Sequence, residues 1–283
     1  MPDPVIEKIN HLPPLREVIR KAGLDAKKSL GQNFLLDLNL TGRIARAAPT
    51  LDGTVIEVGP GPGGLTRALL LAGAEHVIAI EKDRRAIAAL KPLVDAAEGR
   101  LEIIEEDALK LDVASLGPRN KSRQIVANLP YNIATGLLLN WLGQGESLTS
   151  MTLMFQREVG QRLAAGPGED AYGRLSVMAQ WRCHVKRLFD IPPEAFVPPP
   201  KVTSSVVQLI PRPVPLAPAE VNILEEVTRV LFGQRRKMLR ASSKPIGGID
   251  LLEQVGIAGD VRAETLQVED FCRIAEALRK VRA

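Results

Sequence analysis

The sequence predicts an α/β fold with a parallel sheet, followed by a small all-helical domain, and three observations support this prediction. Short apolar runs alternate with amphipathic stretches between residues 55 and 104, an order typical of parallel strands joined by right-handed crossovers. Four prolines then fall within the eight residues 211–218 and indicate a semi-rigid linker. From residue 219 to the end, apolar residues recur at the spacing of one helix face.

These patterns divide the 283 residues into four parts. Residues 1–28 form a basic N-terminal segment, which we expect to be loosely packed. Residues 29–210 form the α/β domain, and residues 211–218 form the linker. Residues 219–283 form the helical domain. A chain of this length is typical of one large domain accompanied by a smaller one.

The elements of the α/β domain can be predicted in order. Asp37 is placed to cap a helix that carries Leu40, Ile44 and Ala47 on one face. Pro92 should end or kink the helix that contains it, because proline has no N–H and its ring clashes with the preceding turn. The predicted strands are 55–58, 77–80, 101–104, 125–127, 151–155, 185–191 and 202–210. The predicted helices are 65–72, 84–96 and 175–182.

Composition is that of an ordinary globular protein, with 45% hydrophobic and 25% charged residues. No apolar run approaches the length of a membrane span and the first residues do not resemble a signal peptide, so we expect a cytoplasmic protein without membrane contact. Cys183 and Cys272 are far apart and the three histidines form no cluster, which predicts neither a disulfide framework nor a metal site. The net charge of +4 mildly favours a polyanionic partner.

A glycine-rich stretch, residues 55–66, carries the first sign of a ligand. An apolar strand ends in Gly59, Gly61 and Gly64, whose spacing lets the backbone turn tightly and approach a ligand closely. Glu57 stands at the end of the strand and would repel an anionic pyrophosphate, whereas a cationic sulfonium ligand with an amino-acid tail would be accepted. A strand-to-helix turn without a ligand remains the alternative.

Acidic side chains also follow the next two strands. The carboxyl ends of parallel strands are where open α/β sheets bind ligands. Glu81 closes the second strand and is suited to accept both hydroxyls of a ribose, while Asp107 follows the third and can accept an adenine exocyclic amine. A solvated carboxylate explains either residue alone, but three acidic groups at three successive strand ends are a less probable coincidence.

The fourth strand ends in the most informative segment, residues 128–133. Asn128 supplies a side-chain amide, Leu129 an outward carbonyl and Tyr131 a ring, since Pro130 fixes the backbone between them. These groups suit a flat base that bears an exocyclic NH₂ group, and a turn with a packed tyrosine is the alternative. Phe196 stands on a proline-rich loop in a chain with few aromatic residues, where we expect a function, and packing of the ring under the loop is the alternative.

The helical domain contains a stretch of single-sign charge. Between residues 229 and 244 there are six basic side chains and no acidic one. A solvated helix face usually mixes both signs, so this stretch favours a phosphate-binding surface. The residues that we assign to RNA binding within it are Arg235, Arg236, Lys237 and Arg240.

In combination, these motifs resemble the bacterial small-subunit (16S) ribosomal RNA adenine N6,N6-dimethyltransferase family over most of the chain. The segments that carry the resemblance are 29–35, 57–61, 81, 107–108, 128–133, 171–176, 196–205 and 235–239. The resemblance implies a Rossmann-like, class I S-adenosylmethionine-dependent methyltransferase domain. It implies that Tyr131 and Phe196 sandwich the target adenine. The expected cofactor-binding residues are Asn33, Leu35, Glu57, Gly59, Gly61, Glu81, Asp107 and Asn128.

The chemistry that this family performs agrees with the motifs. The N6 lone pair of adenine is delocalised, so the site must hold the nitrogen in line with the methyl group and accept its hydrogens at Asn128 and Leu129. Neither a metal nor a covalent intermediate is expected. The expected partner is small-subunit rRNA in a pre-30S particle, bound by a monomer. A large-subunit (23S) methyltransferase, a non-enzymatic assembly factor and an NAD-dependent oxidoreductase are the alternatives.

Overall fold

The computed structural model describes residues 3–24, 32–144 and 147–282. Their contacts divide the chain into two compact units, one of residues 1–160 with 186–211 and the other of residues 161–185 with 212–283. The sequence-based division differs from this one, because residues 161–185 group with the C-terminal helices. Each unit is described by itself below.

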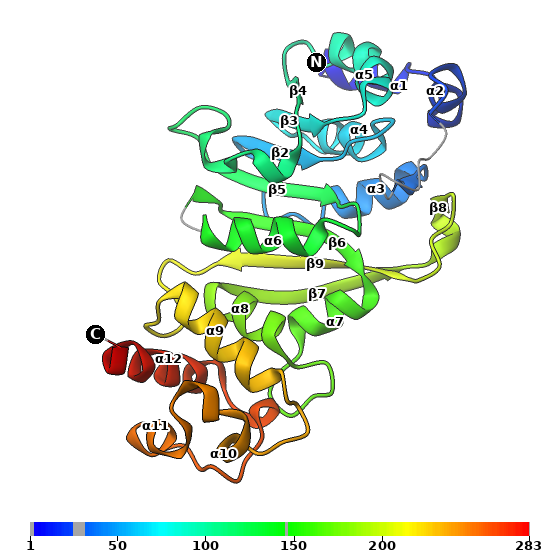
Figure 1. Cartoon of the computed structure of the whole chain (residues 1–283). Helices are drawn as coiled ribbons and strands as arrows, with labels where there is room; N and C mark the ends of the chain where they lie inside the picture. Colours follow the sequence, from blue (N-terminus) through cyan, green and yellow to red (C-terminus); the bar gives the residue numbers. More distant parts are fainter. Residues whose placement is uncertain (1–2, 25–31, 145–146, 283) are drawn as a thin grey trace. The chain divides into compact units, whose positions relative to one another are not determined.

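A seven-stranded sheet in the order β4-β3-β2-β5-β6-β9-β7 is the main feature of the fold (Figure 1). Its strands are β2 (Thr54–Val58), β3 (His76–Glu81), β4 (Leu101–Glu105), β5 (Arg123–Asn128), β6 (Ser150–Gln156), β7 (Cys183–Ile191) and β9 (Ser204–Pro211). The first five strands of the order are parallel, while β9 runs antiparallel to β6. The strand order reverses between β2 and β5, which is the position where such sheets bind ligands at their carboxyl ends.

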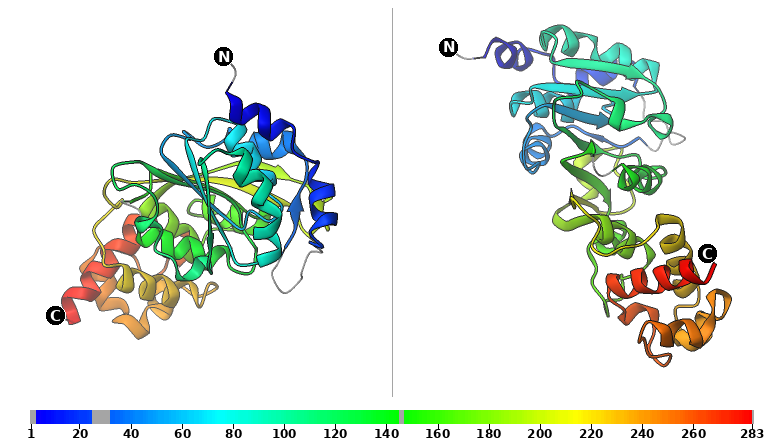
Figure 2. Two further views of the ribbon diagram at one scale, coloured as in Figure 1. Left: turned by 90° about the horizontal axis from the view of Figure 1, so that it is seen from above. Right: turned by 90° about the vertical axis from the view of Figure 1, so that its left-hand side faces the viewer.

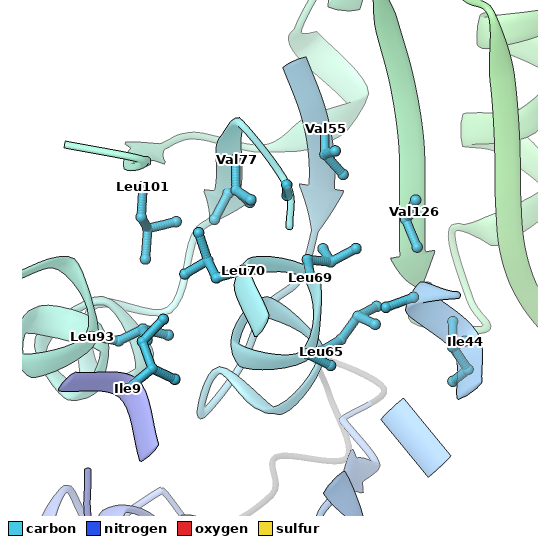
Figure 3. Packing of buried hydrophobic residues seen from close by; sticks show 14 of the residues in the cluster. Ile9, Ile44, Val55, Leu65, Leu69, Leu70, Val77, Leu93, Leu101 and Val126 are labelled. Atoms are coloured by element: carbon cyan, nitrogen blue, oxygen red, sulfur yellow. The ribbon is translucent and has the colours of Figure 1, made fainter. Parts of the chain in front are cut away.

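Six α-helices lie wholly within the described part of the first unit. They are α1 (Pro4–Asn10), α2 (Leu15–Lys21), α3 (Leu38–Ala45), α4 (Gly64–Leu71), α5 (Arg84–Ala96) and α6 (Ala134–Gly143). Helix α4 contacts α3 and α1, and α1 also contacts α5. Figure 3 shows Leu65 and Leu69 of α4 facing Val55 and Val126 of the central strands. These side chains are at most 5% exposed, so α4 and its neighbours α1, α3 and α5 share one apolar core with the sheet. Helix α6 contributes no residue to this cluster.

The N-terminal segment is packed rather than loose over residues 3–24, so that expectation is wrong for this part. Val5 and Ile9 of α1 are 1% and 2% exposed and belong to the same core cluster as the sheet. Asp3 caps α1 by accepting a hydrogen bond from the Val5 N–H at 3.0 Å, and it pairs with Arg100 at 2.6 Å. The rest of the predicted segment, residues 1–2 and 25–28, lies outside the described residues.

Three further local points concern the helices. Pro92 does not end its helix, because α5 continues through it to Ala96, where Leu90, Leu93 and Ala96 are buried and their packing outweighs the lost backbone hydrogen bond. Helix α6 has no predicted counterpart, since its apolar residues lie on nearly every side and give no amphipathic pattern. Helix α7 (Arg157–Ala164) was not predicted either.

The second unit contains the C-terminal helices, coloured gold to red in Figure 2. They are α9 (Val221–Phe232), α10 (Leu239–Ser242), α11 (Gly248–Gln254) and α12 (Val268–Arg282), together with α8 (Arg174–Arg182). Helix α9 contacts α12 and α8. The Phe232 ring stacks on Phe271 at 5.2 Å and meets Tyr172 edge-on at 5.9 Å, which fixes the centre of this unit.

Candidate functional site

A cavity of about 90 Å³ lies at the carboxyl ends of β2, β3 and β5. Its walls include the glycine-rich turn after β2, the residues that follow β3 and β4, and the segment 32–35. The predicted site residues that line it are Asn33, Leu35, Glu57, Gly59, Gly61, Glu81, Asp107, Asn128, Leu129 and Tyr131. The structure therefore brings together, in one unit, every residue expected to bind the cofactor and three of the four expected at the reacting base.

The glycine-rich turn needs its glycines for two reasons. Gly59 and Gly61 have φ values of 70° and 54°, a backbone region that side chains with a Cβ disfavour. A Cβ atom on Gly64 would lie 2.7 Å from the Leu35 carbonyl oxygen, closer than contact distance. The turn is therefore shaped to bring the start of α4 against the segment that carries Asn33 and Leu35.

Glu81 is a buried carboxylate, only 7% exposed, that the backbone holds in place. It accepts N–H hydrogen bonds from Gly61 at 3.3 Å, Lys82 at 2.8 Å and Asp83 at 2.9 Å. Burial raises the pKa of Glu81, while the three backbone donors act in the opposite direction. Its oxygens are thus fixed at the pocket wall with lone pairs left for a hydroxyl donor.

Glu57 is buried more deeply, at 2% exposure, and its Oε2 atom has no hydrogen-bond partner among the described residues. Burial raises the pKa of Glu57 to about 8, and the nearby Glu81 carboxylate adds to the increase. The side chain is therefore protonated near neutral pH. A cation bound at this position would favour the ionised form.

Asp107 caps a short helix and also lines the cavity. Its Oδ1 atom accepts the Leu109 N–H at 3.1 Å and so caps the short helix η2 (Ala108–Lys110), while Oδ2 lies 3.4 Å from Lys82 Nζ. The Leu109 hydrogen bond and then the Lys82 charge lower the pKa of Asp107. At neutral pH this side chain is a pure hydrogen-bond acceptor at the cavity.

The end of β5 presents the amide and the ring predicted from the sequence. Asn128 Nδ2 donates to the Asn33 carbonyl oxygen at 3.3 Å, which directs the amide and leaves Oδ1 as an acceptor. The Tyr131 hydroxyl lies 2.5 Å from Ser204 Oγ, and Ser204 is fully buried in β9. Sequence reasoning missed Ser204, although it falls within the matching segment 196–205.

Phe196 is not part of the cavity lining. Its side chain is 1% exposed and belongs to the buried core cluster. The short strands β1 (Phe34–Leu35) and β8 (Phe196–Val197) pair in antiparallel register, with Leu35 opposite Phe196. The structure thus ties Phe196 to a segment of the cavity wall, and a stacking role requires its ring to leave the core. Strands of two residues give no periodic signal, so this pairing could not be predicted.

In the second unit, the four predicted RNA-binding side chains are all exposed around the turn between α9 and α10. Arg235 pairs with Glu264 at 3.1 Å and donates to the Asp170 carbonyl oxygen at 2.5 Å. The fold therefore adds an acidic neighbour to a stretch that has none in sequence. Arg235 is partly neutralised and supports the local structure, whereas Arg236 and Lys237 have no ion pair among the described residues.

Residues 3–24, 32–144 and 147–282 also lack two features that mark other classes of protein. No group of three or more His, Cys, Asp or Glu side chains is arranged to hold a metal ion there. No helix in the same ranges has the length and apolar character needed to cross a membrane.

The strand order, the glycine-rich turn and the carboxylates at successive strand ends define a class I S-adenosylmethionine-dependent methyltransferase. More narrowly, the chain belongs to the ribosomal RNA adenine dimethylase family, whose pattern matches residues 23–280. This membership excludes the oxidoreductase alternative.

Individual relatives agree with the family. The chain is 61% identical over 269 residues to the "Ribosomal RNA small subunit methyltransferase A" of Paramagnetospirillum magneticum, covering 94% of this chain and 95% of that protein. It is 59% identical to the protein of the same name from Rhodospirillum rubrum, covering 94% and 93%.

Two solved structures share the fold. A dimethyladenosine transferase from Plasmodium falciparum aligns with a TM-score of 0.72 and 26% identity, covering 86% of this chain and 96% of that one. The 23S rRNA methyltransferase ErmE aligns with a TM-score of 0.65 and 25% identity, covering 87% and 100%. The relatives with the small-subunit name are thus far more similar in sequence than the large-subunit enzyme.

Proposed function

We propose that this protein transfers methyl groups from S-adenosylmethionine to N6 of two adjacent adenosines near the 3′ end of small-subunit rRNA. The observation that carries the proposal is that Asn128, Leu129 and Tyr131 line the same cavity as Glu81 and Asp107. Hydrogen-bond acceptors for the target amine and for the nucleoside of the cofactor would therefore lie in one cavity, at the carboxyl ends of the strands. The identity of about 60% to small-subunit methyltransferases supports the choice of substrate.

The chain's residues fit S-adenosylmethionine, which would supply an electrophilic methyl group on a sulfonium centre. The unpaired Oε2 atom of Glu57 would gain a partner in the ammonium group of the amino-acid tail. Glu81 would accept the ribose hydroxyls and Asp107 the adenine amine. Asn33 and Leu35, in the wall of the same cavity, would contact the bound cofactor.

At the reacting base, Asn128 Oδ1 and the Leu129 carbonyl oxygen would accept the two N6 hydrogens. These hydrogen bonds draw the N6 nitrogen out of conjugation with the ring and direct its lone pair at the methyl group. Positioning and preorganised acceptors would therefore account for the rate enhancement. Tyr131 would stack on the extruded base, since a base must leave its stack to be modified. Phe196 would provide the second face after its ring has left the core.

We also propose the form of the substrate, the cellular location and the oligomeric state. We expect the substrate to be rRNA within a pre-30S particle, met in the cytoplasm by a monomer of this protein. Exposed Arg236, Lys237 and Arg240 support phosphate contacts along the particle.

The decisive experiment is mass spectrometry of nucleosides from small-subunit and large-subunit rRNA in cells with and without the gene. We expect dimethyladenosine to disappear from the small-subunit rRNA of the deletion strain and to return with the wild-type gene, but not with Asn128→Ala. Unchanged dimethyladenosine in the small subunit would refute the proposal. Loss from the large subunit instead would establish the 23S alternative.

A further inference from the structure

A second cavity, of about 610 Å³, lies in the same unit and is not used by the proposed reaction. Its walls come from α2, α4 and α5, and Pro62 of the glycine-rich turn lines both this cavity and the first one. We call it the Arg67 pocket, after a buried arginine of α4 in its wall.

The Arg67 pocket is lined by positive charge. Its described lining contains four basic residues and no acidic one, namely Lys21, Arg67, Arg84 and Arg85. Three of these cations have carboxylate partners outside the lining. The three pairs are Lys21 with Glu17 at 2.7 Å, Arg84 with Glu105 at 2.6 Å and Arg85 with Asp83 at 2.7 Å.

Arg67 is the exception. It is 5% exposed and has no carboxylate within ion-pair distance among the described residues. Its Nη1 atom donates to the Pro13 carbonyl oxygen at 2.8 Å, while its Nε atom is buried without any partner. Burial also lowers the pKa of Arg67. A buried guanidinium with unused donors is unfavourable unless an anion compensates it, so this side chain indicates a negatively charged occupant.

The remaining walls are apolar. Val18 of α2 and Ala88, Pro92 and Leu93 of α5 contribute them. Because Pro92 has no N–H, the carbonyl of Ala88 lacks its regular helical donor and can accept a hydrogen bond from a hydroxyl. The pocket thus combines one uncompensated positive charge with apolar side chains, and it is bordered by a residue whose carbonyl lacks its helical donor.

We propose that the Arg67 pocket binds one nucleotide of the RNA substrate outside the reacting adenosine. This inference rests on the proposed function. A phosphodiester carries a single negative charge that matches Arg67, its base can lie on the apolar wall, and its ribose 2′-hydroxyl can donate to Ala88. An acidic peptide matches the charge but has no planar group for the wall. The nucleotide would anchor the strand beside the turn that also borders the cofactor cavity.

The test compares Arg67→Met with Arg46→Met, which removes an exposed arginine of the same unit outside the pocket. We expect Arg67→Met to weaken binding of small-subunit precursor particles about tenfold, the loss of one charged hydrogen bond. It should also reduce the slope of log affinity against log salt by about 0.7, as for one phosphate contact on a single strand. Arg46→Met should change neither. Arg67→Met should be at least as stable as the wild type in urea, since an uncompensated buried charge is removed.

A second variant keeps the inference testable if Arg67→Met does not fold. Ala88→Trp fills the pocket from an exposed position of α5 while keeping the Arg67 side chain, and it should weaken particle binding, whereas Ala72→Trp at an exposed site outside the lining should not. Cofactor affinity, measured by calorimetry, should be unchanged in all four variants.

Each other outcome overturns the inference. Lower stability of Arg67→Met with unchanged particle affinity would make Arg67 a structural residue that holds Pro13. Stabilisation of the wild type by inorganic phosphate that Arg67→Met abolishes, with particle affinity unchanged, would make the pocket a small-anion site. A wild type that neither binds nor methylates the particle would instead refute the proposed function, and the two failures are thereby distinguished.

Discussion

Replacing Glu57 by Gln tests the central electrostatic feature of the cofactor cavity. Burial of this carboxyl group raises its pKa from 4.5 to about 8, and the Glu81 carboxylate adds to the increase, while the Thr66 side chain acts in the opposite direction. The folded protein therefore keeps a proton that the unfolded chain releases above pH 4.5. Stability from this group is present below pH 4.5 and is lost as the pH rises to 8. Glutamine has nearly the same shape and does not titrate.

The size of the effect follows from the two pKa values. Each pH unit between them is about 1.4 kcal/mol. Between pH 5 and pH 8, the stability of Glu57→Gln should therefore rise relative to the wild type by roughly 3 kcal/mol, which is large compared with a net stability of about 5–15 kcal/mol. The measurement is urea denaturation of both proteins at pH 5, 6, 7 and 8 without cofactor.

Glu7→Gln, at an exposed position of α1, is the matched control and should run parallel to the wild type at every pH. Parallel curves for Glu57→Gln and the wild type would show that Glu57 is solvated or paired in solution. The burial argument would then fail, and with it the reason for expecting a cationic ligand group at this position.

Four further predictions concern the proposed reaction. Asn128→Ala should slow single-turnover methylation by about 10²–10³ while particle affinity stays nearly constant, because phosphate contacts dominate binding; a matching loss of affinity would contradict this role. Tyr131→Phe and Ser204→Ala should each lower the methylation rate less than tenfold and the double variant no further than either single one, since both break one hydrogen bond of about 1 kcal/mol. Additive losses would show that the two hydroxyls act separately. Glu81→Ala should weaken S-adenosylmethionine binding in calorimetry by roughly 1.5–3 kcal/mol, and unchanged affinity would remove it from the cofactor site. Arg236→Glu should reduce particle affinity and flatten its salt dependence, as fewer counterions are released, and an unchanged salt slope would leave it a solvated residue.

Local patterns in the sequence were sufficient for much of the fold. Helix α5 spans the predicted residues 84–96, and the strands at 55, 77, 101, 125 and 151 lie within two residues of their predicted starts. The reason is that apolar periodicity and turn residues act over a few neighbouring positions. Because the carboxyl ends of parallel strands meet at one edge of a sheet, Glu57, Glu81, Asp107 and Asn128 could also be expected at one site.

Other features depend on partners that are distant in the sequence. The Ser204 hydroxyl meets Tyr131 across 73 positions, and Arg235 meets Glu264 across 29. The pairing of β1 with β8 likewise joins residues 34–35 to residues 196–197. No local pattern encodes such contacts, because strand register and helix packing decide which side chains face each other.

Solvent exposure of single side chains is the clearest difference between what the sequence determines and what the tertiary structure decides. The sequence determines that Glu57, Arg67 and Phe196 are present, and it gives two charged side chains and one aromatic ring. Only the tertiary structure decides that all three are buried, at 2%, 5% and 1% exposure. A carboxyl group removed from water favours its protonated form, a guanidinium removed from water needs acceptors for its N–H groups, and a phenyl ring removed from water adds to the core. Solvent exposure is a property of the whole packed chain, so the chemistry of these side chains was fixed only when the chain was folded.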